Sequence, residues 1–244
     1  MIPVLAIPHL NRPDLLHRCL RSIDFPVGDL VLIQNGPDED TDIPEVLRIL
    51  QGVDHKRFTH IRGPNLGVGN SWNYAMLAFS APYWMFLGND MYPAEGDLER
   101  MHQAYSDFGD EFGFYFGAHG HSFFIQTAAC VERLGLYDPS FFPAYCEDCD
   151  MMRRARLMGV RHFDVPNIRA EHGIMGMPGS CTIFSDPDLR DQNARTHGNN
   201  FCYYIAKHGG MPGQEVFEHP FNTPGIPWDY VQFKPSRRDA NLWK

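Results

Sequence analysis

The sequence predicts an α/β fold in which helices cover both faces of a doubly wound, mostly parallel, Rossmann-like sheet. Over residues 1–110, short apolar runs alternate four times with segments of helical periodicity. The apolar runs end abruptly at glycine, amide or carboxyl residues, as buried parallel strands do. From about residue 111 this alternation gives way to paired strands, helices and a tail rich in proline, glycine and aromatic residues.

In the first half, each strand is expected where a short apolar run stops at a turn signal. Strands are predicted at 4–7, 30–33, 58–61 and 83–87, and helices at 13–23, 43–50, from about 68 and at 96–108. Pro13 stands in the first turn of the first helix, where the missing N–H of proline costs nothing.

In the second half, the pattern predicts a strand pair, three helices and a further strand. Strands are expected at 113–116, 122–125 and 160–165, and helices from Thr127 to Gly135, at 147–157 and at 189–208. We expect one domain, 1–208, divided into halves 1–110 and 111–208, with the tail 209–244 packed on it as an extended strap.

Composition limits the class of protein. The chain has 244 residues, of which 43% are hydrophobic, and no apolar run reaches the ~20 residues that a membrane-spanning helix needs. The opening residues lack a basic signal-peptide region, and six dispersed cysteines do not form a disulfide scaffold, so a cytoplasmic protein is expected. The net charge of −9 argues against broad binding of nucleic acid through its phosphates.

The stretch Gly88-Asn89-Asp90 directly follows the predicted strand 83–87. This position places Asp90 at the carboxyl edge of the sheet, where open α/β folds bind ligands, so it is a candidate for holding a metal ion or polar ligand. The alternative is a strand-end turn in which Asp90 accepts hydrogen bonds from local amides.

A second acidic stretch, Glu147-Asp148-Cys149-Asp150, begins a predicted helix. Acidic residues in a first turn are stabilised by the helix dipole, so simple capping is one interpretation. Asp150 and Arg154 stand four apart and are expected to pair on the helix surface. Glu147 and Asp148 follow the aromatic segment 141–145, and a carboxylate beside an aromatic wall suits a general base acting on an alcohol.

Three weaker motifs remain. His172 follows the last predicted strand, where a structural role is the common case but an imidazole ligand for a divalent ion also fits. Cys146 and Cys149 have zinc-like spacing but no second pair, which favours a structural role. Asn65-x-Gly-x-Gly lacks the Lys-Ser/Thr of a phosphate-binding P-loop, so its amides suit a nucleobase or ribose better.

These motifs, in this order, resemble those of family 2 glycosyltransferases with the GT-A fold over Val4 to His208. The matching segments are Asn11-Arg12-Pro13, Gln34-Asn35-Gly36, Asn65 to Asn73, Leu87 to Asp90 in the place of the family's DxD motif, the acidic block Asp138 to Arg154, and His172-Gly173. The tail is similar to that of small bacterial and phage-type members.

The resemblance implies an inverting, metal-dependent transfer of a hexosyl or pentosyl group from a nucleotide-diphosphate sugar to an acceptor hydroxyl. Residues 1–110 would bind the nucleotide sugar and residues 111–208 the acceptor. Asp148 would be the general base, supported by Glu147, and Asp90 with His172 would hold Mn²⁺ or Mg²⁺. Donor contacts are expected from Pro8, Arg12, Asn35, Asn65, Gly69, Asn73 and Asn89, and acceptor contacts from Phe142 and Tyr145.

Two departures from the family pattern leave other functions open. Gly88 replaces the first DxD acid, and Gln34 replaces the acid that typically reads the base, which also suits an inactive nucleotide- or sugar-binding module. A second alternative is a phage-type enzyme that glycosylates a hydroxymethylated pyrimidine in DNA. The arginines at 153, 154, 156 and 161 and the tail residues Lys234, Arg237 and Arg238 would supply its basic face. A nucleotidyltransferase is disfavoured because a Lys- and Gly-rich entry loop is missing.

Overall fold

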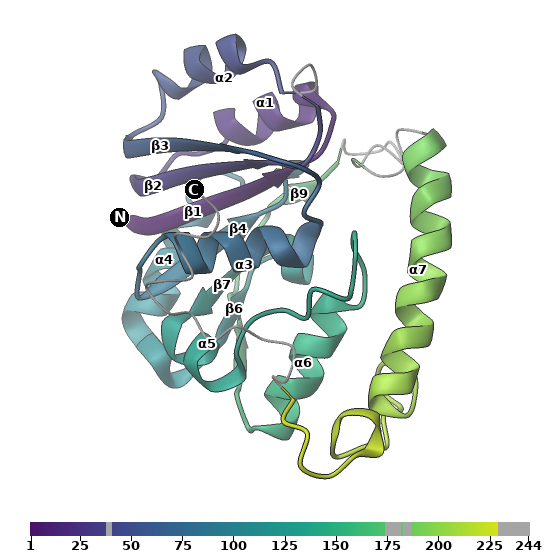
Figure 1. Cartoon of the computed structure of the whole chain (residues 1–244). Helices are drawn as coiled ribbons and strands as arrows, with labels where there is room; N and C mark the ends of the chain where they lie inside the picture. The colour runs from purple at the N-terminus through teal and green to yellow at the C-terminus, as the bar shows by residue number, and fades with distance from the viewer. Residues whose placement is uncertain (38–40, 174–181, 183–186, 229–244) are drawn as a thin grey trace.

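The computed structural model describes residues 1–37, 41–173, 182 and 187–228 (Figure 1). Its centre is a seven-stranded sheet in the order β3-β2-β1-β4-β7-β6-β8. The strands are β1 (Ile2–His9), β2 (Val27–Gln34), β3 (His55–Arg62), β4 (Tyr83–Leu87), β6 (Phe114–Phe116), β7 (Phe123–Thr127) and β8 (His162–Asp164). Strands β1 to β4 are mutually parallel, and β7 runs antiparallel to both β4 and β6. The predicted α/β class, with a mostly parallel sheet, is confirmed.

Helices cover both faces of this sheet. They are α1 (Pro13–Arg21), α2 (Ile43–Leu50), α3 (Val68–Ala78), α4 (Asp97–Phe108), α5 (Ala128–Leu134) and α6 (Glu147–Leu157), whereas α7 (Pro187–His208) lies beside α6 and away from the sheet (Figure 1). Alternate residues of β1 point to opposite faces, so Leu5 packs in one core with α1, α2 and α4, whereas Ala6 packs in the other with α3, α5 and α6.

The sequence prediction missed a second, two-stranded sheet formed by β5 (Met91–Tyr92) and β9 (Glu171–His172). Its strands pair Met91 with His172, so a late segment of the chain lies beside the residues that follow β4. Two-residue strands carry no alternation pattern that a sequence could reveal.

A buried ionic cluster joins α6 to the end of α7. Within it, Lys207 Nζ lies 2.8 Å from Asp138 and 2.6 Å from Asp150, and Arg154 Nε lies 3.0 Å from Asp150. His208 Nε2 lies 2.8 Å from Asp150, and all these side chains are inaccessible to solvent. Asp150 and Arg154 do pair as predicted, but in the interior rather than on the helix surface, because α7 and the residues before α6 cover them.

The tail packs against α6 and α7 over its described residues. Glu215 accepts a hydrogen bond of 2.6 Å from the Tyr204 hydroxyl, and Arg153 donates one of 3.0 Å to the carbonyl of Phe217. The Trp228 ring stacks on His208 with centroids 4.9 Å apart. The acidic segment 38–40 and the basic residues Lys234, Arg237 and Arg238 lie outside the described residues. None of the described helices is both long and apolar enough to cross a membrane.

Candidate active site

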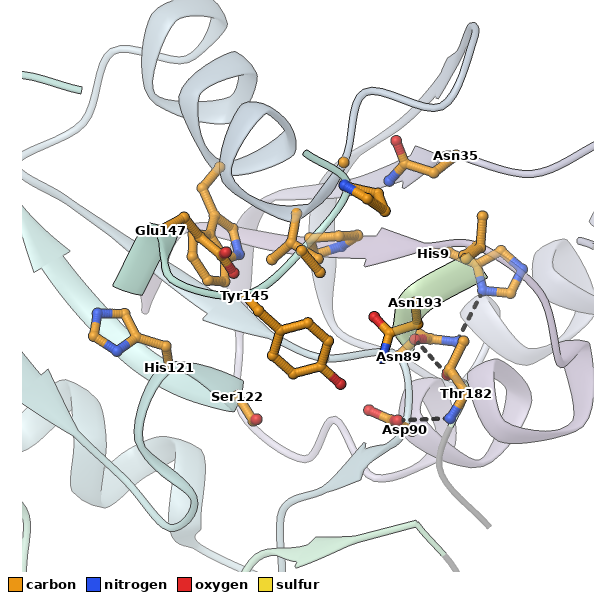
Figure 2. Close-up of a pocket in the computed structure, with 18 of the residues that line it drawn as sticks. His9, Asn35, Asn89, Asp90, His121, Ser122, Tyr145, Glu147, Thr182 and Asn193 are labelled. Carbon is orange, nitrogen blue, oxygen red and sulfur yellow. Dashed lines mark hydrogen bonds between the residues drawn. The ribbon is translucent and has the colours of Figure 1, made fainter. Parts of the chain in front are cut away.

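A cavity of about 360 Å³ opens at the carboxyl ends of β1, β2 and β4 (Figure 2). These strand ends supply Pro8, Asn35 and Asp90, His172 of β9 lies beside Asp90, and the start of α6 supplies the opposite side. The cavity therefore lies at the sheet edge where the strand-end motifs were expected to meet, and both halves of the chain build it.

Asp90 and His172 lie side by side in this cavity, with Asp90 Oδ1 3.3 Å from His172 Nε2. The β5–β9 pairing and a 2.8 Å hydrogen bond from the Gly173 amide to the Asp90 carbonyl hold them together. Burial acts to raise the pKa of Asp90, but hydrogen bonds from His172 and the Thr182 amide bring it below its ordinary value. The hydrogen bond to Asp90 raises the pKa of His172 against the opposing effect of burial.

A hydrogen-bonded chain fixes the residues around Asp90. The Thr182 amide donates to Asp90 Oδ2 at 3.0 Å, and its hydroxyl donates to Asn89 Oδ1 at 3.1 Å. The Asn89 amide donates in turn to His9 Nδ1 at 3.1 Å (Figure 2). It also donates to the Asn11 carbonyl at 3.2 Å. The Asn89 side chain is therefore locked between the end of β1 and Thr182.

Glu147 and Asp148 open α6 on the other side of the cavity. The two residues before them, Tyr145 and Cys146, both have positive φ, of 78° and 72°, and this sharp turn directs the first turn of α6 toward the cavity. Glu147 is only 5% exposed, and its Oε2 has no hydrogen-bond partner among the described residues. Burial, followed by the nearby charge of Asp148, raises the pKa of Glu147 well above its ordinary value.

His121 adds an imidazole that the sequence analysis did not select. Its ring packs against Phe124 and Phe116, with centroids 4.8 and 4.9 Å away, and its Nε2 has no partner in the described part of the chain. Burial lowers the pKa of His121 to about 4, against the opposing influence of Asp148. The ring is therefore neutral at physiological pH.

The predicted asparagines shape the cavity as well as line it. Asn35 Oδ1 accepts from the Leu66 amide at 2.8 Å, and Asn65 Oδ1 accepts from the Gly67 amide at 2.8 Å. Asn73 exchanges two 2.8 Å hydrogen bonds with the backbone of Tyr137 and does not line the cavity. In this structure Asn73 therefore joins α3 to the segment before α6 instead of facing a ligand.

Most of the predicted site residues come together here. The cavity is lined by Pro8, Asn35, Asn65, Asn89, Asp90, Tyr145, Glu147, Asp148 and His172, whereas Arg12, Gly69, Asn73 and Phe142 lie outside its lining. Arg12 pairs with Asp14 at 2.7 Å, and Gly69 lies beneath Glu147, where an added Cβ would come within 3.3 Å of the Glu147 Cβ. Phe142 is 41% exposed on the surface.

Several lining residues had not been identified from the sequence. His9 directly follows the predicted strand and its Pro8, so the strand-end argument that selected Asp90 would also have selected it. His119 and His121 stand in the turn between paired strands, and the presence of two histidines so close together could have marked them as candidate site residues. Thr182, Gln192 and Asn193 carry no local signal, because only the positions of Thr182 and α7 in the fold bring them here.

The donors present fit a divalent cation with few protein ligands. One carboxylate and one imidazole at 3.3 Å suit Mn²⁺ or Mg²⁺, which also accept phosphate and water oxygens. Among the residues described, no group of three His, Cys, Asp or Glu side chains is placed to hold a metal. A bound cation would therefore need oxygen ligands from a substrate, such as a diphosphate.

Solved structures share this fold at low sequence identity. The mannosyltransferase PcManGT from Pyrobaculum calidifontis, solved with GDP-Man and Mn²⁺, is 16% identical with a TM-score of 0.60, over 87% of this chain and 67% of that one. Residues 1–349 of S. aureus TarS with UDP-GlcNAc are 12% identical with a TM-score of 0.55, over 84% and 71%. In two further TarS structures, this chain spans 58% and 35% of the TarS length.

A search of the curated proteins found no match. A family model does match the sequence: residues 4–137, more than half of the chain, fit the model of glycosyl transferase family 2. The matched range contains β1 to β4 and the cavity-lining residues Pro8, Asn35, Asn65, Asn89 and Asp90. The chain therefore belongs to glycosyl transferase family 2.

Proposed function

We propose that this protein is an inverting, metal-dependent glycosyltransferase that moves a hexosyl or pentosyl group from a nucleotide-diphosphate sugar to an acceptor hydroxyl. The observation that carries the proposal is that Asp90, His172 and Asp148 line one cavity although they are far apart in the sequence. Solved structures of the same fold hold GDP-Man with Mn²⁺ and UDP-GlcNAc, which supports a nucleotide-sugar donor.

The donor occupies the side of the cavity formed by the strand ends. Pro8, Asn35, Asn65 and Asn89 line that side and face the nucleotide, with its diphosphate directed toward Asp90 and His172. Mn²⁺ or Mg²⁺ held by Asp90 and His172 would neutralise the charge that develops on the departing diphosphate. The Gln34 side chain is used elsewhere, since it donates to the Gly36 carbonyl at 3.0 Å and accepts from His60 at 2.7 Å.

The acceptor approaches from the α6 side. Its hydroxyl oxygen attacks the anomeric carbon and forms the new C–O bond, while the bond from that carbon to the diphosphate oxygen breaks and its electron pair leaves with the diphosphate. Asp148 takes the hydroxyl proton as a general base. Burial raises the pKa of Glu147 and so favours its neutral form, which would donate a hydrogen bond that orients the acceptor, and the Tyr145 ring forms a side wall.

The Asp148→Asn variant tests this assignment. The amide keeps the shape of the side chain but cannot accept the proton, so we expect sugar transfer to fall at least 100-fold, the lower end of typical general-base contributions. Donor affinity should change little, because Asp148 lies on the acceptor side. Titration calorimetry with UDP-GlcNAc and GDP-mannose, in Mn²⁺ or in EDTA, measures donor affinity, and product analysis measures transfer. Unchanged turnover in the variant would remove Asp148 from the mechanism.

The wild-type protein with donor and Mn²⁺ also distinguishes a transferase from an inactive binding module. A pure binder releases no nucleoside diphosphate from the donor, whereas a transferase slowly hydrolyses it even without an acceptor. The replacement of an acid by Gly88 suits this site, since a Cβ there would lie 3.0 Å from Asp90 Oδ1 and crowd that carboxylate. The substitution is thus compatible with a working Asp90.

Of the arginines expected to form a basic face for a DNA acceptor, Arg156 is 60% exposed, but the other three described ones are buried or paired. Arg154 is buried against Asp150, and Arg161 pairs with Glu111 at 2.9 Å. Arg153 donates to the Phe217 carbonyl. We therefore propose an acceptor hydroxyl but do not assign it to DNA.

A further inference from the structure

A second, smaller cavity of about 170 Å³ shares Asp148 with the first. One wall is a face of α6 on which Asp148, Met152 and Arg156 recur every four residues, with Cys149 beside them. The other wall is the tail segment Pro212–Glu215, which runs beside the ends of α6 and α7 (Figure 1). We name this space the α6–tail groove; it reaches the proposed base from the side of the tail.

The α6–tail groove has an apolar floor and polar ends. Met152 and Pro212 supply the apolar surface. Glu215, whose side chain is 3% exposed, is fixed by the 2.6 Å hydrogen bond from Tyr204 and lies 3.5 Å from Arg156. The Arg156 side chain is 60% exposed, so its guanidinium remains available to a further oxygen atom.

The charge of these walls selects against an anionic ligand. Among the described residues, the lining of the groove contains the two carboxylates of Asp148 and Glu215 and one guanidinium, that of Arg156, so this lining carries net negative charge. Phosphate groups would be repelled, whereas a neutral polyol can place a hydroxyl oxygen on the exposed guanidinium of Arg156. A sugar ring also offers an apolar C–H face of the kind that packs on Met152 and Pro212.

We propose that the α6–tail groove binds the terminal sugar ring of a neutral glycan acceptor and presents one of its hydroxyls to Asp148. The inference rests on the proposed function and names the acceptor class for it. Drug-sized ligands occupy pockets of roughly 300–1,000 Å³, so a groove of about 170 Å³ accommodates one ring and leaves the rest of the glycan in solvent. The proton passes from that hydroxyl to Asp148 as the new glycosidic bond forms on the donor's anomeric carbon.

The Met152→Trp substitution fills the groove and tests the assignment. The matched control is Met158→Trp at the end of the same helix, where Met158 is 39% exposed and lies outside both cavities. Saturation-transfer NMR is run with the methyl glycosides of glucose, galactose, mannose and N-acetylglucosamine, and with glucose 6-phosphate. We expect at least one methyl glycoside to bind the wild-type protein, to weaken at least 10-fold in Met152→Trp and to bind normally in Met158→Trp.

Three outcomes overturn the proposal: no glycoside binds the wild-type protein, the two tryptophan variants bind glycosides equally, or glucose 6-phosphate binds more tightly than methyl glucoside. Calorimetry of UDP-GlcNAc and GDP-mannose with Mn²⁺ on the same proteins separates this result from a failure of the proposed function. Loss of glycoside binding in Met152→Trp without any donor binding would support the sugar site while rejecting the transferase assignment.

Discussion

At the scale of single residues, adjacent carboxylates in the first turn of α6 have different surroundings. The Glu147 carboxyl is buried above Gly69 without a partner for Oε2 in the described residues, whereas Asp148 Oδ1 accepts a 2.7 Å hydrogen bond from the Cys149 amide. Burial favours the neutral form of Glu147. In the proposed mechanism, this difference lets Glu147 donate a hydrogen bond to the acceptor while Asp148 accepts its proton.

The effect of burial on the Glu147 carboxyl can be measured by comparing the free energy of unfolding of the Glu147→Gln variant with that of wild type. Because the pKa of Glu147 is raised above 4.5 in the folded state, its favourable contribution is present below pH 4.5 and is lost as pH rises through the folded pKa. Glutamine does not titrate, so the stability of the variant relative to wild type should grow from pH 4.5 upward, by about 1.4 kcal/mol for each unit of raised pKa.

Urea unfolding between pH 4.5 and pH 8 measures this difference. The matched control is Glu132→Gln, on the exposed surface of α5, for which we expect a free energy of unfolding within about 0.5 kcal/mol of wild type. A Glu147→Gln difference that stayed constant over the range would show that Glu147 is charged in the folded protein.

At the scale of elements, the buried ionic cluster determines where α6 and α7 lie. Lys207 is the cation between Asp138 and Asp150, and its amine is inaccessible to solvent. The Lys207→Met substitution leaves those carboxylates without their shared cation, and removing one partner of a buried pair typically costs about 3–5 kcal/mol. We expect a loss of that size in urea unfolding, against a change within about 0.5 kcal/mol for Lys56→Met on the exposed side of β3. A loss below 1 kcal/mol would mean that the cluster does not hold α7.

Elements with a strong local pattern were predictable from the sequence, and those defined by distant contacts were not. The strand 83–87 and the helix 147–157 coincide with β4 and α6, and Thr127 caps α5 as expected by accepting from the Cys130 amide at 3.1 Å. The β5–β9 pair, the antiparallel direction of β7 and the burial of Asp150 depend on segments that are far apart in the chain. Local periodicity carries no information about such partners.

Some residues of the candidate site were likewise predictable from the sequence, and others were not. Asp90 was identified because parallel strands bring their carboxyl ends to one edge, which is a property of the fold, whereas Asn35 was expected only from the resemblance to family 2 glycosyltransferases. Asn73 belongs to the family motif, yet its amide is used by the Tyr137 backbone, and only coordinates reveal that competition. Thr182 reaches Asp90 from a segment whose own residues predict no element.

At the scale of the whole molecule, the cavity connects the two halves of the chain. Pro8, Asn35 and Asp90 come from the first half, and Asp148 and His172 come from the second. A ligand that contacts both sides stabilises both against unfolding, because it binds only when they are assembled. Donor binding should therefore act on the unfolding of the entire domain.

This coupling predicts that the domain unfolds in one thermal transition, and that the Tm of this transition rises when the donor binds. A nucleotide sugar at 100 times its Kd, with Mn²⁺, should stabilise the fold by ~2.7 kcal/mol, which corresponds to roughly 5–11 °C in Tm for a chain of this size. Calorimetric scans with UDP-GlcNAc or GDP-mannose measure the shift in Tm. Scans with the free sugar alone serve as the control, and in them the Tm should not change. If the ligand moved only one of two separate transitions, residues 1–110 would be unfolding independently of α6 and β9, and the cavity would not bind donor and acceptor as a single site.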